Sequence, residues 1–390
     1  MMRVTPRRPL WTWVKVVLAL IGIDLLLFRA GLFFEWVPQL RGENATTWGL
    51  LYTAIRHLEI DPQSPATAYV VGSSVLFLGV NEERLNEVLE EDRLPPRATL
   101  LTTFGATATD SALLAARALE DHPWLVVYAA TARDFSKTAP LDTPVSRMLL
   151  DSSTDLPAMP AVTGEERLTL IVRRYWQLYR YRTFVRIGVW EGTTGLLART
   201  IAGHAPPVLP PPPATAEDRL PPEALERFHF ARITPEAYRA WQTWNTSRRF
   251  DDFVAWMRAN KSQALDAYKT QRLASFGPQD NPQVTSLAWM LRRIRDRGAR
   301  AVVVYFPENP AFRDPAAAEY FDASLSDAYA KLFADETAAT GARFVDLRGL
   351  LPAEDFHDLI HPNLAGMRTL SRRLADIVAE EWRAREGGAP

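Results

Sequence analysis

Five short apolar runs, each bounded by turn residues, most constrain the fold of this chain. Segments with helical periodicity occupy the gaps between them. Strands that alternate with helices are typical of βαβ units, in which each helix carries the chain back so that the next strand runs parallel. The expected strands are 66–72, 98–103, 124–130, 300–306 and 342–347. The sequence therefore predicts an α/β domain built on a parallel five-stranded sheet.

The helical patterns predict helices at 81–91, 108–121, 283–298, 315–340 and 363–385. Gly341 follows the fourth of these, where a helix commonly ends on a glycine with positive φ. A chain of 390 residues is long enough for a complete α/β core and further segments. We expect the α/β domain to comprise residues 40–134 and 283–390.

A long interruption, residues 135–282, separates the third and fourth expected strands. It is too long for a loop in a compact sheet, so we expect a largely helical insertion. Its proline-rich part, 205–222, predicts a semi-rigid connector, because proline fixes φ and lacks an N–H donor. The helical flanks are rich in tryptophan, tyrosine and arginine. They fit the core of a small helical subdomain, and also a lid or a surface that lies on a membrane or a partner.

The N-terminal region predicts attachment to a membrane. Three arginines, Arg3, Arg7 and Arg8, precede an apolar stretch at 11–36 that is long enough for a helix to cross a hydrocarbon core of about 30 Å. No convincing cleavage site follows, so we expect an uncleaved transmembrane anchor rather than a signal peptide. The positive-inside rule then keeps residues 1–10 in the cytoplasm and places residues 40–390 on the periplasmic or extracellular side.

Asp24 lies near the middle of this apolar stretch, where an ionised carboxylate is costly. A protonated carboxyl group or a partner helix would explain it. Equally, a helix that is otherwise so apolar can tolerate one aspartate.

The composition argues against several classes of function. The formal net charge is −1 and no broad basic field is present, so we do not expect nucleic acid binding. The chain has no cysteine, which excludes disulfides, thiolate zinc sites and a cysteine nucleophile. Asp355, His357 and His361 lie near one another in the sequence but lack the ligand spacing of a zinc motif, so we expect no metal site.

Two adjacent serines, Ser73 and Ser74, follow the first expected strand in the segment YVVGSSVLFLGV. In parallel sheets, ligands bind beyond the carboxyl ends of the strands. Gly72 permits a sharp turn that would project a hydroxyl group there. The serines equally fit a plain strand-to-helix turn in which they bond only to local backbone. A serine nucleophile additionally needs a base that removes its proton.

Only two of the six histidines, His357 and His361, follow an expected strand at that edge of the sheet. Asp358 precedes His361 by three residues, in a loop ahead of the last expected helix. This spacing lets a carboxylate orient an imidazole and stabilise its charged form. Ser74, His361 and Asp358 are therefore candidates for nucleophile, base and orienting acid.

These segments resemble the SGNH or GDSL hydrolases. The GSSV segment is similar to the first sequence block of that family, with Ser73 in the usual place of aspartate and Ser74 in the place of the nucleophile. The DLIH segment supplies Asp358 and His361 of the last block. Gly105 matches the glycine of the second block, whose N–H joins that of Ser74 in an oxyanion hole.

The resemblance spans 66–135 and 299–385 and implies a flavodoxin-like three-layer α/β/α fold, a Ser-His-Asp triad and no cofactor. The third block departs from the family pattern G-x-N-D, because the third expected strand runs into YAATARDFS and lacks the asparagine of the oxyanion hole. Thr131 or Arg133 could supply a donor there, and Asn309 could reach in from beyond the fourth strand. Arg133 and Asp134 equally fit a buried pair.

The anchor, the GSS motif, the PEN segment and the terminal D-x-x-H are most similar to a membrane-anchored branch. That branch includes the teichoic acid D-alanylation protein DltD and alginate O-acetylation proteins. The resemblance implies a serine esterase or O-acyltransferase that acts outside the cytoplasmic membrane, with a membrane-bound O-acyltransferase as partner, on acyl esters of a cell-envelope polysaccharide or polymer. The alternative is a weakly active or inactive accessory or carbohydrate-binding partner of such an acyltransferase, which the missing asparagine favours.

Overall fold

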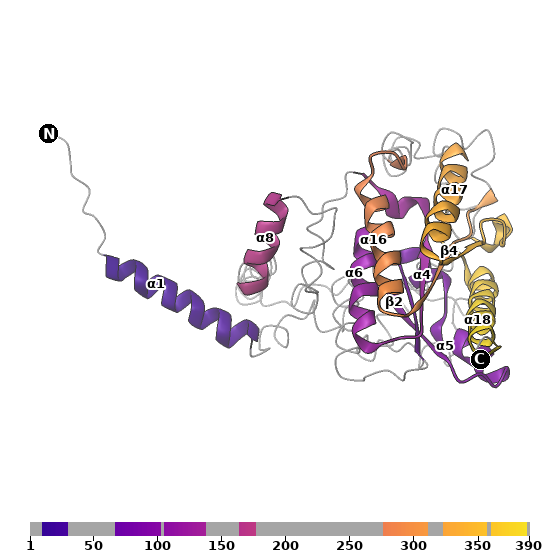
Figure 1. Cartoon of the computed structure of the whole chain (residues 1–390), viewed down its shortest axis with the longest axis horizontal. Coiled ribbons are helices and arrows are strands. Elements are labelled where there is room, and N and C mark those ends of the chain that lie inside the picture. Colours follow the sequence, from indigo (N-terminus) through magenta and orange to yellow (C-terminus); the bar gives the residue numbers. More distant parts are fainter. Residues whose placement is uncertain are drawn as a thin grey trace, which may run out of the picture.

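A computed structural model describes residues 10–29, 67–102, 105–137, 164–176, 276–310, 323–356 and 360–387. Within these ranges the chain forms a parallel five-stranded sheet in the order β2-β1-β3-β4-β5 (Figure 1). The strands are β1 (Thr67–Gly72), β2 (Arg97–Thr102), β3 (Leu125–Ala130), β4 (Arg300–Tyr305) and β5 (Arg343–Asp346). All five strands that the sequence predicts are confirmed, with ends that shift by one or two residues.

The central strands β1 and β3 are almost entirely apolar, because helices cover both faces of the sheet. Every residue of β1 and β3 is buried. Tyr69 and Val71 point into one half of the core, whereas Ala68 and Val70 point into the other. A strand buried on both faces needs a continuous apolar run, and these runs were the signal in the sequence.

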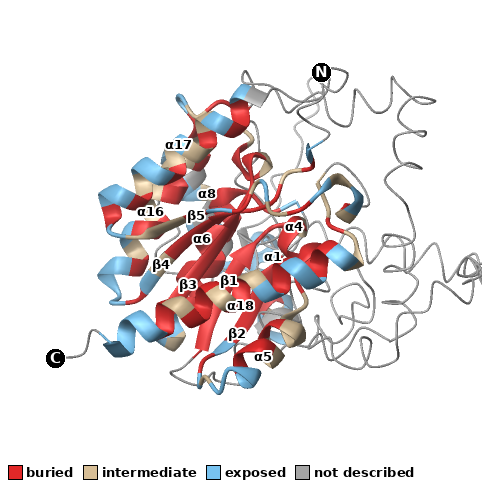
Figure 2. Ribbon diagram, turned by 90° about the vertical axis from the view of Figure 1, so that its right-hand side faces the viewer, coloured by how far each residue is buried: buried red, intermediate tan, exposed pale blue. Residues whose placement is uncertain are grey.

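The helices form two layers, one on each face of the sheet (Figure 2). One layer contains α6 (Ala108–Ala118), α16 (Pro282–Asp296) and α17 (Ala323–Thr340). The other contains α4 (Ser74–Gly79), α5 (Glu82–Glu91) and α18 (Leu364–Gly387). This confirms the three-layer α/β/α fold. The predicted helices are present, although residues 315–322 of the fourth lie outside the described residues. Gly341 has a φ of 75°, as expected for a residue that ends a helix. The short α4 was not predicted.

The strand order 2-1-3-4-5 is that of flavodoxin-like sheets. The chain leaves β1 toward β2 on one side of the sheet, whereas it leaves β3 toward β4 on the other side. The loops after β1 and β3 therefore diverge and leave a crevice at the carboxyl edge of the sheet, where such folds bind ligands. Ser74 follows β1 and Thr131 follows β3, so both lie at this edge.

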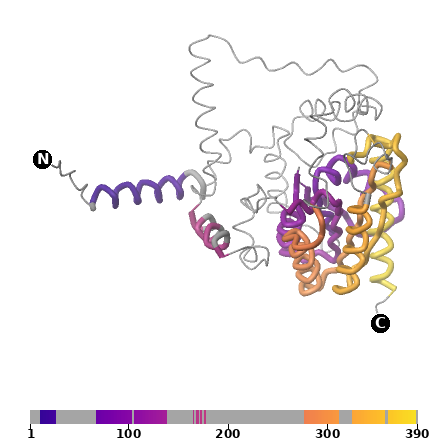
Figure 3. Tube along the Cα trace, turned by 90° about the horizontal axis from the view of Figure 1, so that it is seen from above, coloured from indigo at the N-terminus to yellow at the C-terminus, as the bar shows by residue number. Residues whose placement is uncertain are grey.

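The described part of the N-terminal region is α1 (Leu10–Ile23) followed by a π-helical segment, η1 (Asp24–Arg29). A further helix, α8 (Gly164–Tyr175), belongs to the predicted insertion. Figures 1 and 3 both show α1 and α8 on the side of the molecule away from α17 and α18. None of the helices in the described ranges is both long enough and apolar enough to cross a membrane. Residues 30–36 of the predicted anchor and the proline-rich connector lie outside the described residues.

Candidate active site

Gly72 lets the first strand turn sharply into the helix that carries Ser74. A Cβ atom at this position would lie 2.9 Å from the carbonyl oxygen of Ala129 on the neighbouring strand β3. Only glycine therefore fits this approach of the two strands without a backbone shift. The carbonyl oxygen of Ser73 then accepts the first hydrogen bonds of α4, from Leu76 N at 3.1 Å and Phe77 N at 3.2 Å. Ser74 is consequently the first residue of α4.

The Ser74 hydroxyl lies within hydrogen-bonding distance of an imidazole from the other end of the domain. Ser74 Oγ is 3.1 Å from His361 Nε2, although 287 residues separate the two in the sequence. Both side chains are partly exposed to solvent. A base within about 2.6–3.2 Å of a hydroxyl can remove its proton when the hydroxyl attacks a carbonyl carbon.

The loop that carries His361 is closed at its base by backbone contacts. Phe356 and Pro362 form an isolated antiparallel bridge, and Asn363 N donates to Asp355 O at 2.8 Å. Asn363 also caps α18, because its Oδ1 accepts from Ala365 N at 2.9 Å and Gly366 N at 3.2 Å. These contacts fix both the start of α18 and the residue next to His361.

The serine helix and the histidine loop also pack directly against each other. A Cβ atom at Gly79, the last residue of α4, would lie 3.2 Å from Cγ of Pro362 and 3.3 Å from Cδ2 of Leu370. Immediately after α4, Asn81 N donates to Ser371 Oγ at 2.9 Å. The end of α4 therefore packs on α18 and on Pro362. This packing fixes the position of Ser74 relative to His361.

The Ser73 hydroxyl bonds to a buried carboxylate and does not face His361. It forms no capping bond with α4 and hydrogen-bonds to Asp134 instead. Asp134 Oδ2 also accepts from Thr131 N at 3.0 Å and Tyr128 OH at 3.2 Å, and its Oδ1 accepts from Thr131 Oγ1 at 3.0 Å. This buried carboxylate joins the end of β1 to the end of β3. Burial raises the pKa of Asp134 to about 6, while the hydrogen bonds act in the opposite direction.

The predicted oxyanion-hole residues have different surroundings. Gly105 follows β2 with a φ of 65°, a conformation that favours glycine, and it is exposed. Both donors of Thr131 point to Asp134. Asn309 follows β4 and is almost fully buried. Thr131 therefore serves the Asp134 cluster in this structure rather than supplying a donor to the candidate site.

Asp358, the predicted orienting acid, and His357 lie outside the described residues. The closed base of the loop, between Phe356 and Pro362, brackets both of them. Among the residues that the structure describes, no group of three His, Cys, Asp or Glu side chains could hold a metal ion.

Two features of the site were not predicted from the sequence. The bond from Ser73 to Asp134 joins the ends of two strands, so no local pattern predicts it, although the T-x-x-D spacing of Thr131 and Asp134 is that of a capping box. The N-cap role of Asn363 could have been predicted from the sequence, because asparagine directly before a helical pattern is a common N-cap.

Comparison with known proteins agrees with this geometry. Residues 266–369 match the GDSL-like Lipase/Acylhydrolase family. The matched segment contains β4, β5 and His361, whereas Ser74 lies outside it and is brought to His361 by the fold. No curated protein shows a significant match to the chain. The match supports the SGNH/GDSL superfamily and, in general terms, a hydrolase that acts on esters.

Proposed function

We propose that this protein is a serine esterase or O-acyltransferase in which Ser74 is the nucleophile and His361 the general base. The observation that carries the proposal is the contact of 3.1 Å between Ser74 Oγ and His361 Nε2 at the carboxyl edge of the sheet. Hydroxyl and imidazole groups in this relation are the reacting pair of serine hydrolases. The family match at 266–369 supports ester chemistry independently.

The proposed reaction has two steps. His361 Nε2 takes the proton of Ser74 as Oγ attacks the acyl carbonyl carbon, and it then gives that proton to the departing alcohol oxygen as the ester bond breaks. The acyl group remains on Ser74 Oγ. In the second step His361 deprotonates water or a glycan hydroxyl, whose oxygen attacks the acyl carbon. The bond from the acyl carbon to Ser74 Oγ then breaks, and His361 returns the proton to Oγ. Asp358 is proposed to hold the imidazole in the correct tautomer.

The developing oxyanion needs N–H donors, and we assign these to Ser74 and Gly105. The N–H of Ser74 belongs to the first turn of α4, where a helix provides no acceptor of its own. Gly105 follows the neighbouring strand β2 at the same edge of the sheet. Asn309 is a further candidate donor that follows β4.

The proposed setting is the outer side of the cytoplasmic membrane. Residues 11–36 would anchor the chain, and an acylated cell-envelope polysaccharide or polymer would be the substrate, with a membrane-bound O-acyltransferase as the partner. The support is the apolar N-terminal stretch that follows three arginines, together with the similarity of the motifs to the membrane-anchored branch.

A second candidate function is an accessory or carbohydrate-binding partner with little or no catalysis. The specific observation in its favour is the third block, where asparagine is missing and both donors of Thr131 are used by Asp134. Removal of one oxyanion donor typically costs ~10²–10³ in rate.

The two functions are separated by labelling the full chain with a serine-directed fluorophosphonate and by turnover of p-nitrophenyl acetate. Ser74→Ala should abolish both, whereas Ser324→Ala, an exposed serine at the start of α17, should behave as the wild type. Ser73→Ala should still be labelled because it retains the Ser74 hydroxyl. A folded wild-type protein that shows neither labelling nor turnover would establish the accessory function instead.

A further inference from the structure

One face of α8 carries an apolar stripe of exposed side chains. Leu168, Ile171, Val172 and Tyr175 recur at the spacing i, i+3, i+4 and i+7, which places them on one side of a helix. Their exposed fractions are 63%, 39%, 40% and 68%. Such a stripe normally packs on a protein core, and here it faces outward.

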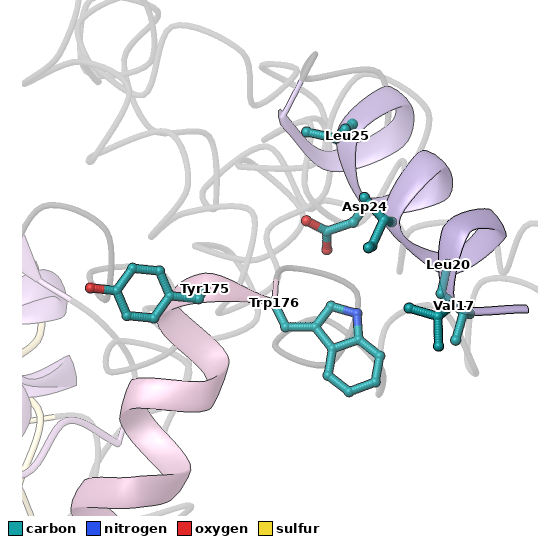
Figure 4. Close-up of a pocket in the computed structure, with 7 residues that line it drawn as sticks. Val17, Leu20, Asp24, Leu25, Tyr175 and Trp176 are labelled. Carbon is teal, nitrogen blue, oxygen red and sulfur yellow. The ribbon is translucent and has the colours of Figure 1, made fainter. Parts of the chain in front are cut away.

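The N-terminal helix lies near this stripe and is apolar apart from Thr12 and Lys15. Its exposed side chains include Trp11, Trp13, Leu18 and Ile21. Side chains of α1 and η1 line, together with Tyr175 and Trp176, a pocket of about 380 Å³ (Figure 4). Val17 and Leu20 contribute apolar walls, and Asp24 contributes a buried carboxylate. The apolar surfaces of α1 and α8 therefore meet along one edge, although about 140 residues separate them in the sequence.

The charges around α8 indicate what would cover the stripe. The first turn of α8 carries Glu165 and Glu166, and residues 167–190 then contain six arginines and no further acidic residue. The first of these, Arg167, is exposed on α8. Tyr175 and Trp176, at the end of α8, are residue types that concentrate where a bilayer meets water. An apolar helical stripe with flanking arginines and terminal aromatic residues matches the requirements of an anionic membrane surface.

We propose that α8 lies in the interface of an anionic lipid bilayer, with Leu168, Ile171 and Val172 turned toward the acyl chains and Arg167 toward the headgroups. This inference rests on the proposed membrane attachment of the N-terminal region, and it is independent of the ester chemistry at Ser74. A second contact with the membrane, formed by the insertion, would restrict how the α/β domain can turn relative to the bilayer.

The absence of cysteine from the chain makes the test direct. Single cysteines are introduced in the full chain at Ile171, at Thr169 and at Leu18, and each is labelled with an environment-sensitive fluorophore. The variants are reconstituted in vesicles of phosphatidylcholine with phosphatidylglycerol. Thr169 is the matched control, because it lies on α8 but is rotated by about 200° from Ile171. Leu18 reports whether α1 is in lipid.

The label at Ile171→Cys should be quenched about two-fold or more strongly by spin-labelled lipid than the label at Thr169→Cys, and should be protected from aqueous iodide. Vesicles of phosphatidylcholine alone should reduce this difference, since they lack the negative headgroups. The same preparations are labelled at Ser74 with fluorophosphonate, so that the proposed ester chemistry is tested separately.

Each contrary result has a distinct meaning. Equal lipid quenching at Ile171 and Thr169, with Leu18 in lipid, would overturn the assignment of α8 and leave the anchor intact. Labels that face water at both Leu18 and Ile171 would overturn the membrane attachment as well. Protection of Ile171 from both iodide and spin-labelled lipid would overturn the proposal in favour of a protein surface that covers the stripe.

Discussion

At the scale of single residues, the candidate site depends on how the fold treats two neighbouring serines differently. The Ser74 hydroxyl faces His361, whereas the Ser73 hydroxyl faces the buried carboxylate of Asp134. The resemblance to the hydrolase family identified Ser74, but it did not identify the partner of Ser73. That partner depends on the distance between the ends of β1 and β3, which local sequence patterns do not encode.

His361→Gln should reduce kcat/KM for an ester substrate by ~10³-fold or more, because glutamine offers a hydrogen bond but cannot accept the serine proton at neutral pH. Initial rates with p-nitrophenyl acetate measure the effect, and circular dichroism checks the fold. Arg368→Gln, an exposed change on α18, serves as the control. A His361→Gln enzyme that retains wild-type rates would exclude His361 as the base.

Asp134→Asn should change how the free energy of unfolding depends on pH. Burial raises the pKa of Asp134 from 3.8 to about 6, so between these values the folded state binds a proton that the unfolded state does not. The contribution of Asp134 to stability is therefore largest below about pH 4 and falls as pH rises through about 6, by an amount on the order of 3 kcal/mol.

Urea unfolding at several pH values measures this difference between wild type and Asp134→Asn. Comparison of the two proteins is necessary because burial also raises the pKa of Glu82, to about 7, which adds a dependence of the same sign. The stability advantage of the wild type should shrink from pH 4 to pH 7. An advantage that is constant, or that grows with pH, would show that the Asp134 carboxylate is not held in the folded state as described.

At the scale of helices and strands, much of the fold could be predicted because its signals are local. Strands buried on both faces require uninterrupted apolar runs, and the helices between them show clear periodicity. The short helix α4 was not predicted, because it lacks the periodic alternation of apolar and polar residues that identified the other helices. All of its residues after Ser74 are buried, so it has no polar face to reveal a helical period. The loop around Asp358 and most of the insertion lie outside the described residues, so those predictions stay open.

Gly72→Ala should destabilise the junction between β1 and β3, since its Cβ would lie 2.9 Å from the backbone oxygen of Ala129. We expect a loss of about 1–3 kcal/mol in the free energy of unfolding and slower fluorophosphonate labelling, because the start of α4 must shift. Gly349→Ala is the matched control, as a Cβ there meets no atom within 4 Å. Equal stability of the two variants would contradict the assigned role of Gly72.

Asn363→Ala should cost about 1 kcal/mol, because the first turn of α18 loses the side-chain acceptor of Ala365 N and Gly366 N. The rate of Ser74 labelling should fall by more than the stability loss alone explains, since the Asn363 side chain also holds the base of the His361 loop by donating from Nδ2 to Glu354 O at 2.6 Å. Thr369→Ala, exposed on the same helix, is the control. An unchanged labelling rate in Asn363→Ala would show that this cap does not position His361.

At the scale of the whole molecule, the fold assembles the candidate site from segments that the insertion separates. β3 and β4 pair in register from Leu125 with Arg300 to Ala130 with Tyr305, although residues 131–299 lie between them. The family match begins at residue 266 and does not reach Ser74. Sequence patterns could identify each segment, whereas only the strand order brings Ser74 and His361 together.

Labelling of Ser74 should consequently depend on the native fold as a whole. In a urea series, the loss of fluorophosphonate labelling should coincide with the loss of the circular dichroism signal, because an unfolded chain does not keep two residues 287 positions apart in contact. Labelling that persists after the α/β domain has unfolded would indicate a reactive serine that needs no partner.

The most direct measurement is the position of the fluorophosphonate adduct, determined by mass spectrometry of peptides from the full-length wild type and from His361→Gln. We expect a single adduct, on Ser74 in the peptide that contains Gly72 and Ser73, and a rate of formation that falls by ~10³-fold when His361 is replaced. An adduct on another residue, or equal rates in the two proteins, would contradict the assignment of Ser74 and His361 as the reacting pair.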